Sequence, residues 1–155
     1  MFRKMTDIKF ICFNCNTMGY YKDNIMEVSH NKLLDFLTCP NCDNKLIPVD
    51  KELSETIFIL NKLGYKTITS CAGDIYIKNE NRFYNKPCIE FEYDKDKFEI
   101  IKNIVNYIDT KQLLCIEINY NKTKFTLLIT SDINADENKN YFIDRMDCLI
   151  TMLMD

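Results

Sequence analysis

Four of the eight cysteines occur in two CxxC pairs, and these are the residues best suited to chemistry. Cys12 and Cys15 form the first pair, Cys39 and Cys42 form the second, and 23 residues lie between the pairs. A CxxC turn directs both sulfurs toward one point, and two such turns complete a tetrahedron around a metal ion. We therefore predict a zinc site, with iron in a rubredoxin-like site as the alternative. Four thiolates occupy every position of tetrahedral zinc, so the predicted role is structural and not catalytic.

Two other interpretations of these cysteines are less favoured. No apolar segment typical of a secretory signal precedes Cys12, so we expect a cytoplasmic protein whose thiols stay reduced. In that compartment CxxC pairs are more typical of metal ligands than of disulfides. The single histidine, His30, would have to displace a cysteine from a complete ligand set, so we expect an exposed residue there.

The other four cysteines lack the spacing of metal ligands. Alternation in the segment 88–93 places Cys88 and Glu90 on the face opposite Ile89 and Phe91. In the segment 113–120 the same alternation places Cys115 and Glu117 together on the polar face. Two interpretations stay open: a binding surface that includes Glu90 and Glu117, or a solvated sheet face with small cysteine side chains, which is the favoured one. The four cysteines that lack ligand spacing are Cys71, Cys88, Cys115 and Cys148.

The segment Ser70-Cys71-Ala72-Gly73-Asp74 is a candidate site or a tight turn. Gly73 permits a backbone conformation with positive φ, and the side chains of Ser70 or Asp74 can accept hydrogen bonds from exposed amides. On these grounds a structural turn is favoured, and Ser70, Cys71, Gly73 and Asp74 are kept as candidate binding residues.

This segment also carries a resemblance. The sequence "LNKLGY", then a predicted strand, then Ser70-Cys71-Ala72-Gly73, resembles the Ser-Cys-Ser-Gly-Arg signature of the wybutosine-synthesising methyltransferase-related proteins. It is also similar to uncharacterised low-GC bacterial proteins that join a zinc ribbon to such a segment. The resemblance covers residues 53–77 and implies a site for tRNA modification. Asp74 departs from the signature, because an anion stands where that family carries Arg or His.

Hydrophobic periodicity predicts the elements that position these residues. Residues 1–49 are expected to form a zinc ribbon, with a short helix at 32–37, and residues 50–155 an α+β domain. The predicted order in this domain is αββαββα, with one mainly antiparallel sheet. Asp50 is expected to cap a helix at 51–63 that ends before Gly64, and residues 79–87 to form a polar loop. Two further helices are expected. Asp94 is expected to cap the first, at 95–108, and the second runs from about 140 to the C-terminus. The inward-facing residues of the first are Phe98, Ile101, Val105 and Ile108.

Charge and composition exclude some partners. The net charge is −3, with equal numbers of basic and acidic residues in 1–50, so neither part has the basic excess typical of nucleic-acid-binding proteins. A nucleic-acid reader would need Lys9, Lys22 and Lys45 on one side of the ribbon. No apolar run approaches the ~20 residues of a membrane span.

The sequence therefore favours a non-catalytic zinc-ribbon protein that binds a protein or a protein–nucleic acid assembly. The abundance of Asn, Ile and Lys is typical of an AT-rich genome, which permits a phage or mobile-element inhibitor of host nucleic-acid machinery. The alternative is an RNA-modification enzyme, or its remnant, with a site at residues 70–74.

Overall fold

The computed structural model describes residues 2–4, 8–15, 17–20, 27–29, 38–39, 41–73, 75–130 and 134–155. The chain divides into two compact units, Met1–Leu63 (unit 1) and Gly64–Asp155 (unit 2), which are described separately below. The predicted short helix at 32–37, His30, Lys22 and Asp74 lie outside the described residues.

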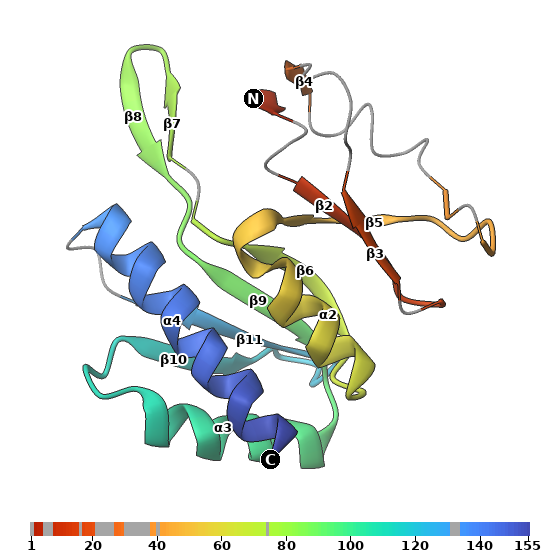
Figure 1. Cartoon of the computed structure of the whole chain (residues 1–155). Helices are drawn as coiled ribbons and strands as arrows, with labels where there is room; N and C mark the ends of the chain where they lie inside the picture. Colours follow the sequence, from red (N-terminus) through yellow and green to blue (C-terminus); the bar gives the residue numbers. More distant parts are fainter. Residues whose placement is uncertain are drawn as a thin grey trace. The chain divides into compact units, whose positions relative to one another are not determined.

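Unit 1 is built on a three-stranded antiparallel sheet with the order β3-β2-β5 (Figure 1). The strands are β2 (Ile8–Cys12), β3 (Thr17–Tyr20) and β5 (Ile47–Asp50). Strands β1 (Phe2–Lys4) and β4 (Glu27–Ser29) form a separate antiparallel pair. β2 is buried along most of its length, since Ile8, Phe10, Ile11 and Cys12 are all buried, and the first CxxC pair begins at its last residue, Cys12.

A helix follows β5 directly, as expected. It starts as a short 3-10 turn, η2 (Lys51–Leu53), and continues as α2 (Ser54–Lys62), with Leu53, Ile57 and Leu60 buried on one face. The predicted cap is wrong, because the side chain of Asp50 accepts no capping hydrogen bond and is itself buried. α2 contacts β2 and β5, so this helix belongs to compact unit 1, and the predicted domain boundary at residue 49 stays a prediction.

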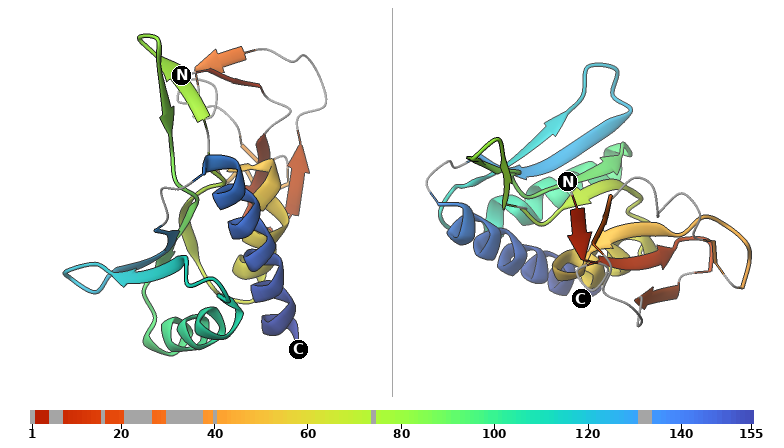
Figure 2. Two further views of the ribbon diagram at one scale, coloured as in Figure 1. Left: turned by 90° about the vertical axis from the view of Figure 1, so that its left-hand side faces the viewer. Right: turned by 90° about the horizontal axis from the view of Figure 1, so that it is seen from above.

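Unit 2 confirms the α+β class. Its four-stranded antiparallel sheet has the order β10-β11-β9-β6, and helices α3 and α4 both cover one face of it (Figure 2). Asp94 caps α3 by accepting hydrogen bonds from the amides of Asp96 and Lys97, as predicted, and Asn134 caps α4 in the same way. The elements are β6 (Thr67–Cys71), β9 (Cys88–Glu92), α3 (Lys95–Ile108), β10 (Leu114–Ile118), β11 (Lys124–Ile129) and α4 (Ala135–Met154).

The core of unit 2 lies between the sheet and its two helices. Phe91 of β9 and Phe125 of β11 are register partners whose rings stack with centroids 4.7 Å apart. Phe98 of α3 meets the Phe125 ring edge-on at 5.3 Å. Phe142 and Met146 of α4 are fully buried as well. These contacts fix which face of the sheet is covered, and therefore which side chains point away from the core.

The predicted polar loop at 79–87 is partly a strand. β7 (Ile75–Lys78) pairs with β8 (Asn81–Tyr84) in a separate two-stranded sheet, with Lys78 opposite Asn81. Asn79 and Glu80 make the turn with φ of 51° and 64°. Two consecutive left-handed residues form the primed turn that matches strand twist. The usual Asn-Gly or Asp-Gly signal of this turn is absent from the sequence, which explains the wrong prediction.

Candidate metal centre

The two CxxC pairs sit at the ends of regular structure in unit 1. Cys12 is the last residue of β2, and Cys15 follows in a tight turn. Cys39 comes directly after Thr38, which forms an isolated bridge with Lys45, and Cys42 lies in the turn that this bridge closes. Cys12 and Cys39 are buried, whereas Cys15 and Cys42 are half-buried. Each pair therefore contributes one sulfur from inside the unit and one from its surface.

The four sulfurs converge on one point. Their Sγ atoms all lie within 4.8 Å of one another, with 3.5 Å between Cys12 and Cys42 and 3.9 Å between Cys15 and Cys39. A tetrahedral ion with sulfur ligands at about 2.3 Å requires sulfur–sulfur separations of about 3.8 Å. A disulfide would bring two of them to about 2.0 Å. The separations fit a four-sulfur metal site, so Cys12, Cys15, Cys39 and Cys42 are positioned to hold a metal ion.

The two turns place hydrogen-bond donors close to these sulfurs. The amide of Cys15 donates to Cys12 Sγ at 3.4 Å, and Asn44 Nδ2 donates to Cys42 Sγ at 3.4 Å. In the second turn the amide of Asp43 donates to the carbonyl of Cys39, and Asp43 takes a left-handed φ of 62°. Donors directed at sulfur stabilise the thiolate form that a metal needs. Asn44 was not among the predicted site residues, and the only sequence signal for it is its place two residues after Cys42.

Crowding shifts the pKa values of two of these thiols in opposite directions. A hydrogen bond from the backbone of Asn44, helped by the Cys15 thiol, lowers the pKa of Cys42 to about 6. The bond shared with Cys42, together with burial, raises the pKa of Cys15 to about 12. Without an ion, Cys42 is therefore the first of these two thiols to lose its proton as the pH rises. A divalent ion stabilises thiolates, so binding is coupled to the release of the remaining protons.

The predicted candidates at residues 70–74 are not brought together on one side of the sheet. Ser70 pairs in register with the buried Ile89, whereas Cys71 pairs with Cys88, so the side chains of Ser70 and Cys71 point to opposite faces. Gly73 has a φ of +97°, as the turn interpretation requires. Asp74 lies outside the described residues. A binding role for this turn stays a prediction.

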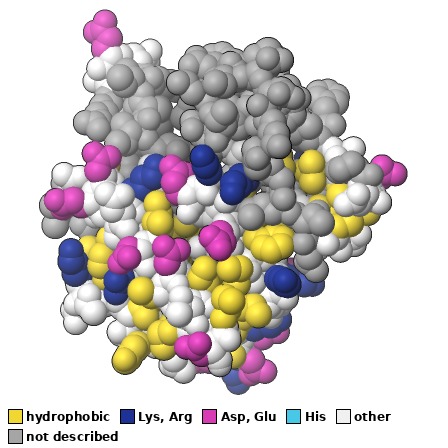
Figure 3. Space-filling view, viewed as in Figure 1, with side chains coloured by type: hydrophobic (Ala, Val, Ile, Leu, Met, Phe, Trp, Pro, Cys, Tyr) yellow, Lys and Arg dark blue, Asp and Glu magenta, His cyan; other side chains and the backbone are white. Residues whose placement is uncertain are grey.

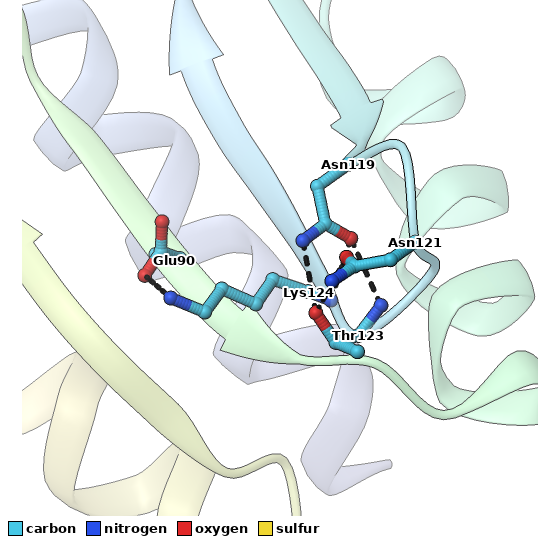
Figure 4. A network of polar contacts seen from close by, with 5 residues as sticks. All are labelled: Glu90, Asn119, Asn121, Thr123 and Lys124. Atoms are coloured by element: carbon cyan, nitrogen blue, oxygen red, sulfur yellow. Dashed lines mark hydrogen bonds and ion pairs between the residues drawn. The ribbon is translucent and has the colours of Figure 1, made fainter.

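Glu90 and Glu117 share the face of the sheet that α3 and α4 leave uncovered, yet they are not neighbours. Both pair with Thr126 of β11, one from each side, so a whole strand separates them. Glu90 Oε1 lies 3.6 Å from Lys124 Nζ (Figure 4). Glu117 accepts a hydrogen bond from the Cys115 thiol at 3.6 Å. Each carboxylate thus has its own partner, and their predicted role in binding stays a prediction.

The hairpin that joins β10 and β11 is held by its own side chains. Asn119 Oδ1 accepts hydrogen bonds from the amides of Thr123 and Lys124, and Asn119 Nδ2 donates to Thr123 Oγ1 at 2.9 Å. Thr123 Oγ1 donates in turn to Asn121 Oδ1 (Figure 4). This network fixes the turn that precedes Lys124 and so helps to position its ion pair with Glu90.

Comparison with known proteins gives no relative for this chain. No family model, no curated protein and no solved structure matches it. Within the described part of the chain, no helix combines the length and the apolar character needed to cross a bilayer.

Proposed function

We propose that the four-cysteine cluster holds a structural zinc ion in a non-catalytic binding protein, which recognises a protein or a protein–nucleic acid assembly. The observation that carries this proposal is the convergence of four sulfurs from two turns at separations that suit one tetrahedral ion. All four coordination positions are then filled by the chain. The ion has no position left for a water or substrate, and its contribution is to the folding of unit 1.

Zinc and iron both suit a tetrahedral four-sulfur site, and a direct measurement separates them. We expect about one zinc per chain by elemental analysis of protein purified without added metal. The d¹⁰ zinc ion has no redox chemistry, so the zinc protein should be colourless. A stoichiometric amount of iron with visible thiolate absorption would contradict the assignment to zinc, and protein without metal would contradict the site itself.

Surface charge supports a protein partner more than naked nucleic acid. On the face seen in Figure 3, acidic and basic side chains of the described residues are interspersed. Of the three lysines that a nucleic-acid reader would use, Lys9 is half-buried, Lys45 is exposed and Lys22 lies outside the described residues. Phosphate contacts need clustered cations, which these observations do not supply. The proposal extends to a phage or mobile-element inhibitor of host machinery, on residue composition alone.

A capture experiment tests recognition. The tagged, metal-loaded protein should retain a partner at fixed stoichiometry from the lysate of a low-GC bacterium, before and after nuclease treatment. Retention that survives nuclease indicates a protein partner, and retention lost with nuclease indicates an assembly held by nucleic acid. The Cys39→Ser variant, which lacks one ligand, should lose the partner together with the metal, whereas Cys148→Ser, on α4 of unit 2, should keep both. A protein that stays monomeric and retains nothing would contradict the proposed recognition while leaving the metal site intact.

A further inference from the structure

Two thiols outside the metal centre face each other across neighbouring strands of unit 2. Cys71 is the last residue of β6, Cys88 is the first residue of β9, and the two are direct register partners in the antiparallel ladder. Both side chains are half-buried thiols. The motif Ser70-Cys71-Ala72-Gly73 therefore has a structural counterpart that its own sequence does not reveal, namely the cysteine that begins the next strand of the sheet.

Their spacing suits a covalent bond. Residues directly opposite each other in an antiparallel ladder have Cα atoms about 4.5 or 5.5 Å apart. Both values lie inside the range of about 4.4–6.8 Å that disulfides span. Register partners also point to the same face of the sheet. The next residue in β9, Ile89, is fully buried against the helices, so Cys71 and Cys88 both lie on the other face.

The turn after Cys71 is packed against the residue that precedes Cys88. Gly73 takes a φ of +97°, and a Cβ on this glycine would lie 3.0 Å from Pro87 Cγ. The amide of Gly73 donates to Cys71 Sγ at 3.4 Å. The thiolate is the form that attacks a disulfide. The turn thus keeps Cys71 close to the start of β9, where Cys88 lies.

A third cysteine in the same row provides a contrast. Cys115 of β10 pairs with Leu128, and Leu128 pairs with Cys88, so β11 separates the two cysteines. Two strand spacings amount to about 10 Å, which is too far for a disulfide. Burial, with smaller contributions from the Glu117 carboxylate, raises the pKa of Cys115 and reduces its thiolate fraction at neutral pH.

We propose that Cys71 and Cys88 form a dithiol modification site, which a low-molecular-weight disulfide such as oxidised glutathione converts into a cross-strand disulfide. The Cys71 thiolate attacks one glutathione sulfur, a mixed disulfide forms, and one glutathione thiolate leaves. The Cys88 thiolate then attacks Cys71 Sγ, and the second glutathione leaves. The two cysteines are oxidised, one glutathione disulfide is reduced to two thiols, and the two cysteine protons pass to these thiols or to solvent.

The Cys71–Cys88 disulfide would close a loop at the base of the β7–β8 hairpin. Residues 72–87 lie between the two cysteines, and they include the β7–β8 hairpin. Among the described strands, β6 lies at the edge of the sheet, so the disulfide would also join this edge to its neighbour β9. The site is thus a reversible covalent link at the base of the hairpin, where oxidation limits how far β6 can separate from β9.

Peptide mapping of the full, metal-loaded chain tests this proposal directly. Trypsin cleavage places the four cysteines outside the metal centre on separate peptides, residues 67–78, 83–95, 112–122 and 146–155. After treatment with oxidised glutathione, acid quench and alkylation of remaining thiols, we expect peptide 67–78 joined to 83–95. The intact protein should lose the mass of two hydrogens and regain it with dithiothreitol. Unchanged metal content shows that the cluster cysteines did not take part.

Matched variants keep the test decisive. Cys88→Ser should abolish the linked peptide and leave glutathione attached to Cys71, whereas Cys115→Ser should leave the yield of the link unchanged. Phenylarsine oxide, which bridges two close thiols, should protect both Cys71 and Cys88 of the unmodified chain from alkylation and should protect neither in Cys71→Ser. Links to 112–122 or 146–155 at equal yield, or a stable glutathione adduct on Cys88 in the unmodified chain, would overturn the proposal.

Discussion

The two units are stabilised by different means. Unit 2 buries side chains contributed by its sheet and by both helices, with the Phe91 and Phe125 rings stacked at the centre. In unit 1, α2 packs on β2 and β5, but the second CxxC turn has little regular structure of its own. One isolated bridge, Thr38 with Lys45, and a few turn hydrogen bonds hold it. Two of the buried side chains in unit 1 are the cysteines Cys12 and Cys39.

The difference indicates which part of the chain the proposed ion would stabilise. An apolar core loses stability gradually as contacts are removed, because each buried group contributes a few kcal/mol. The stability that a metal cluster provides is lost almost completely with one ligand, because the missing ligand opens the coordination sphere. Ligand loss, acidification and core truncation separate these two kinds of stabilisation.

Loss of a metal ligand should have the largest effect. Cys39→Ser removes a buried sulfur from the cluster, and structural zinc contributes about 10–16 kcal/mol in small zinc domains. We expect no bound metal and fast amide hydrogen exchange in the turns around 12–15 and 39–44. Exchange in β9, β11 and α3 should stay slow. Cys148→Ser is the control, and slow exchange in both turns of the metal-free variant would contradict the dependence on an ion.

Acidification should release the metal from the unaltered protein. Each thiolate that takes a proton leaves the ion, so affinity falls as the pH falls. Of the two thiols with shifted pKa values, Cys42 stays charged to the lower pH, because a hydrogen bond from the Asn44 backbone lowers its pKa to about 6. The thiolate contribution of Cys42 is therefore complete above its ordinary pKa and lost as the pH falls through about 6. A chromophoric zinc indicator should report release below this pH. Asn44→Ala removes the Nδ2 donor to Cys42 Sγ but keeps the backbone donor, so it should move release only slightly to higher pH.

Truncation in the core of unit 2 should have an intermediate effect. Phe91→Ala removes a stacked ring that is 1% exposed, and such substitutions cost about 3–5 kcal/mol. Chemical denaturation followed by circular dichroism should show this loss, with the metal content unchanged. Tyr120→Ala, at a fully exposed position, is the matched control and should change stability by less than about 0.5 kcal/mol. Loss of metal in Phe91→Ala would show that the units are not independent.

Removal of a helix cap should have the smallest effect. Asp94 accepts hydrogen bonds from the amides of Asp96 and Lys97, both at 3.1 Å, and Asp94→Ala should cost about 1 kcal/mol. Asp94→Asn keeps an acceptor in the same place and should retain most of this stability. Equal losses in both variants would assign the effect to charge and not to capping.

The residue pattern predicted the second unit well, because its periods are long and regular. The predicted buried stripe of α3, residues Phe98, Ile101, Val105 and Ile108, is confirmed, and so is its Asp94 cap. The expected start of α4 was several residues late. Its first turn is polar and solvent-facing, so periodicity gives no signal there, and the Asn134 cap marks the start instead.

The four cysteines of the candidate site were also predictable, because ligand spacing within a turn is a local property. The donors around them were not, since Asn44 is one polar residue among many until the turn brings it to Cys42 Sγ. The pairing of Cys71 with Cys88 was hidden for the same reason. It depends on the register of two strands that are separated by a hairpin, and a bulge between Thr67 and Thr69 shifts that register.

The two-residue turn at Asn79 and Glu80 has a consequence for how this chain tolerates change in length. Its left-handed backbone sets Lys78 opposite Asn81 and so fixes every later pair up to Ile75 with Tyr84. One inserted or deleted residue at this tip would exchange inward and outward positions along the returning strand. Length variants of this protein should therefore differ here by even numbers of residues, and an epitope or label is best inserted in such increments.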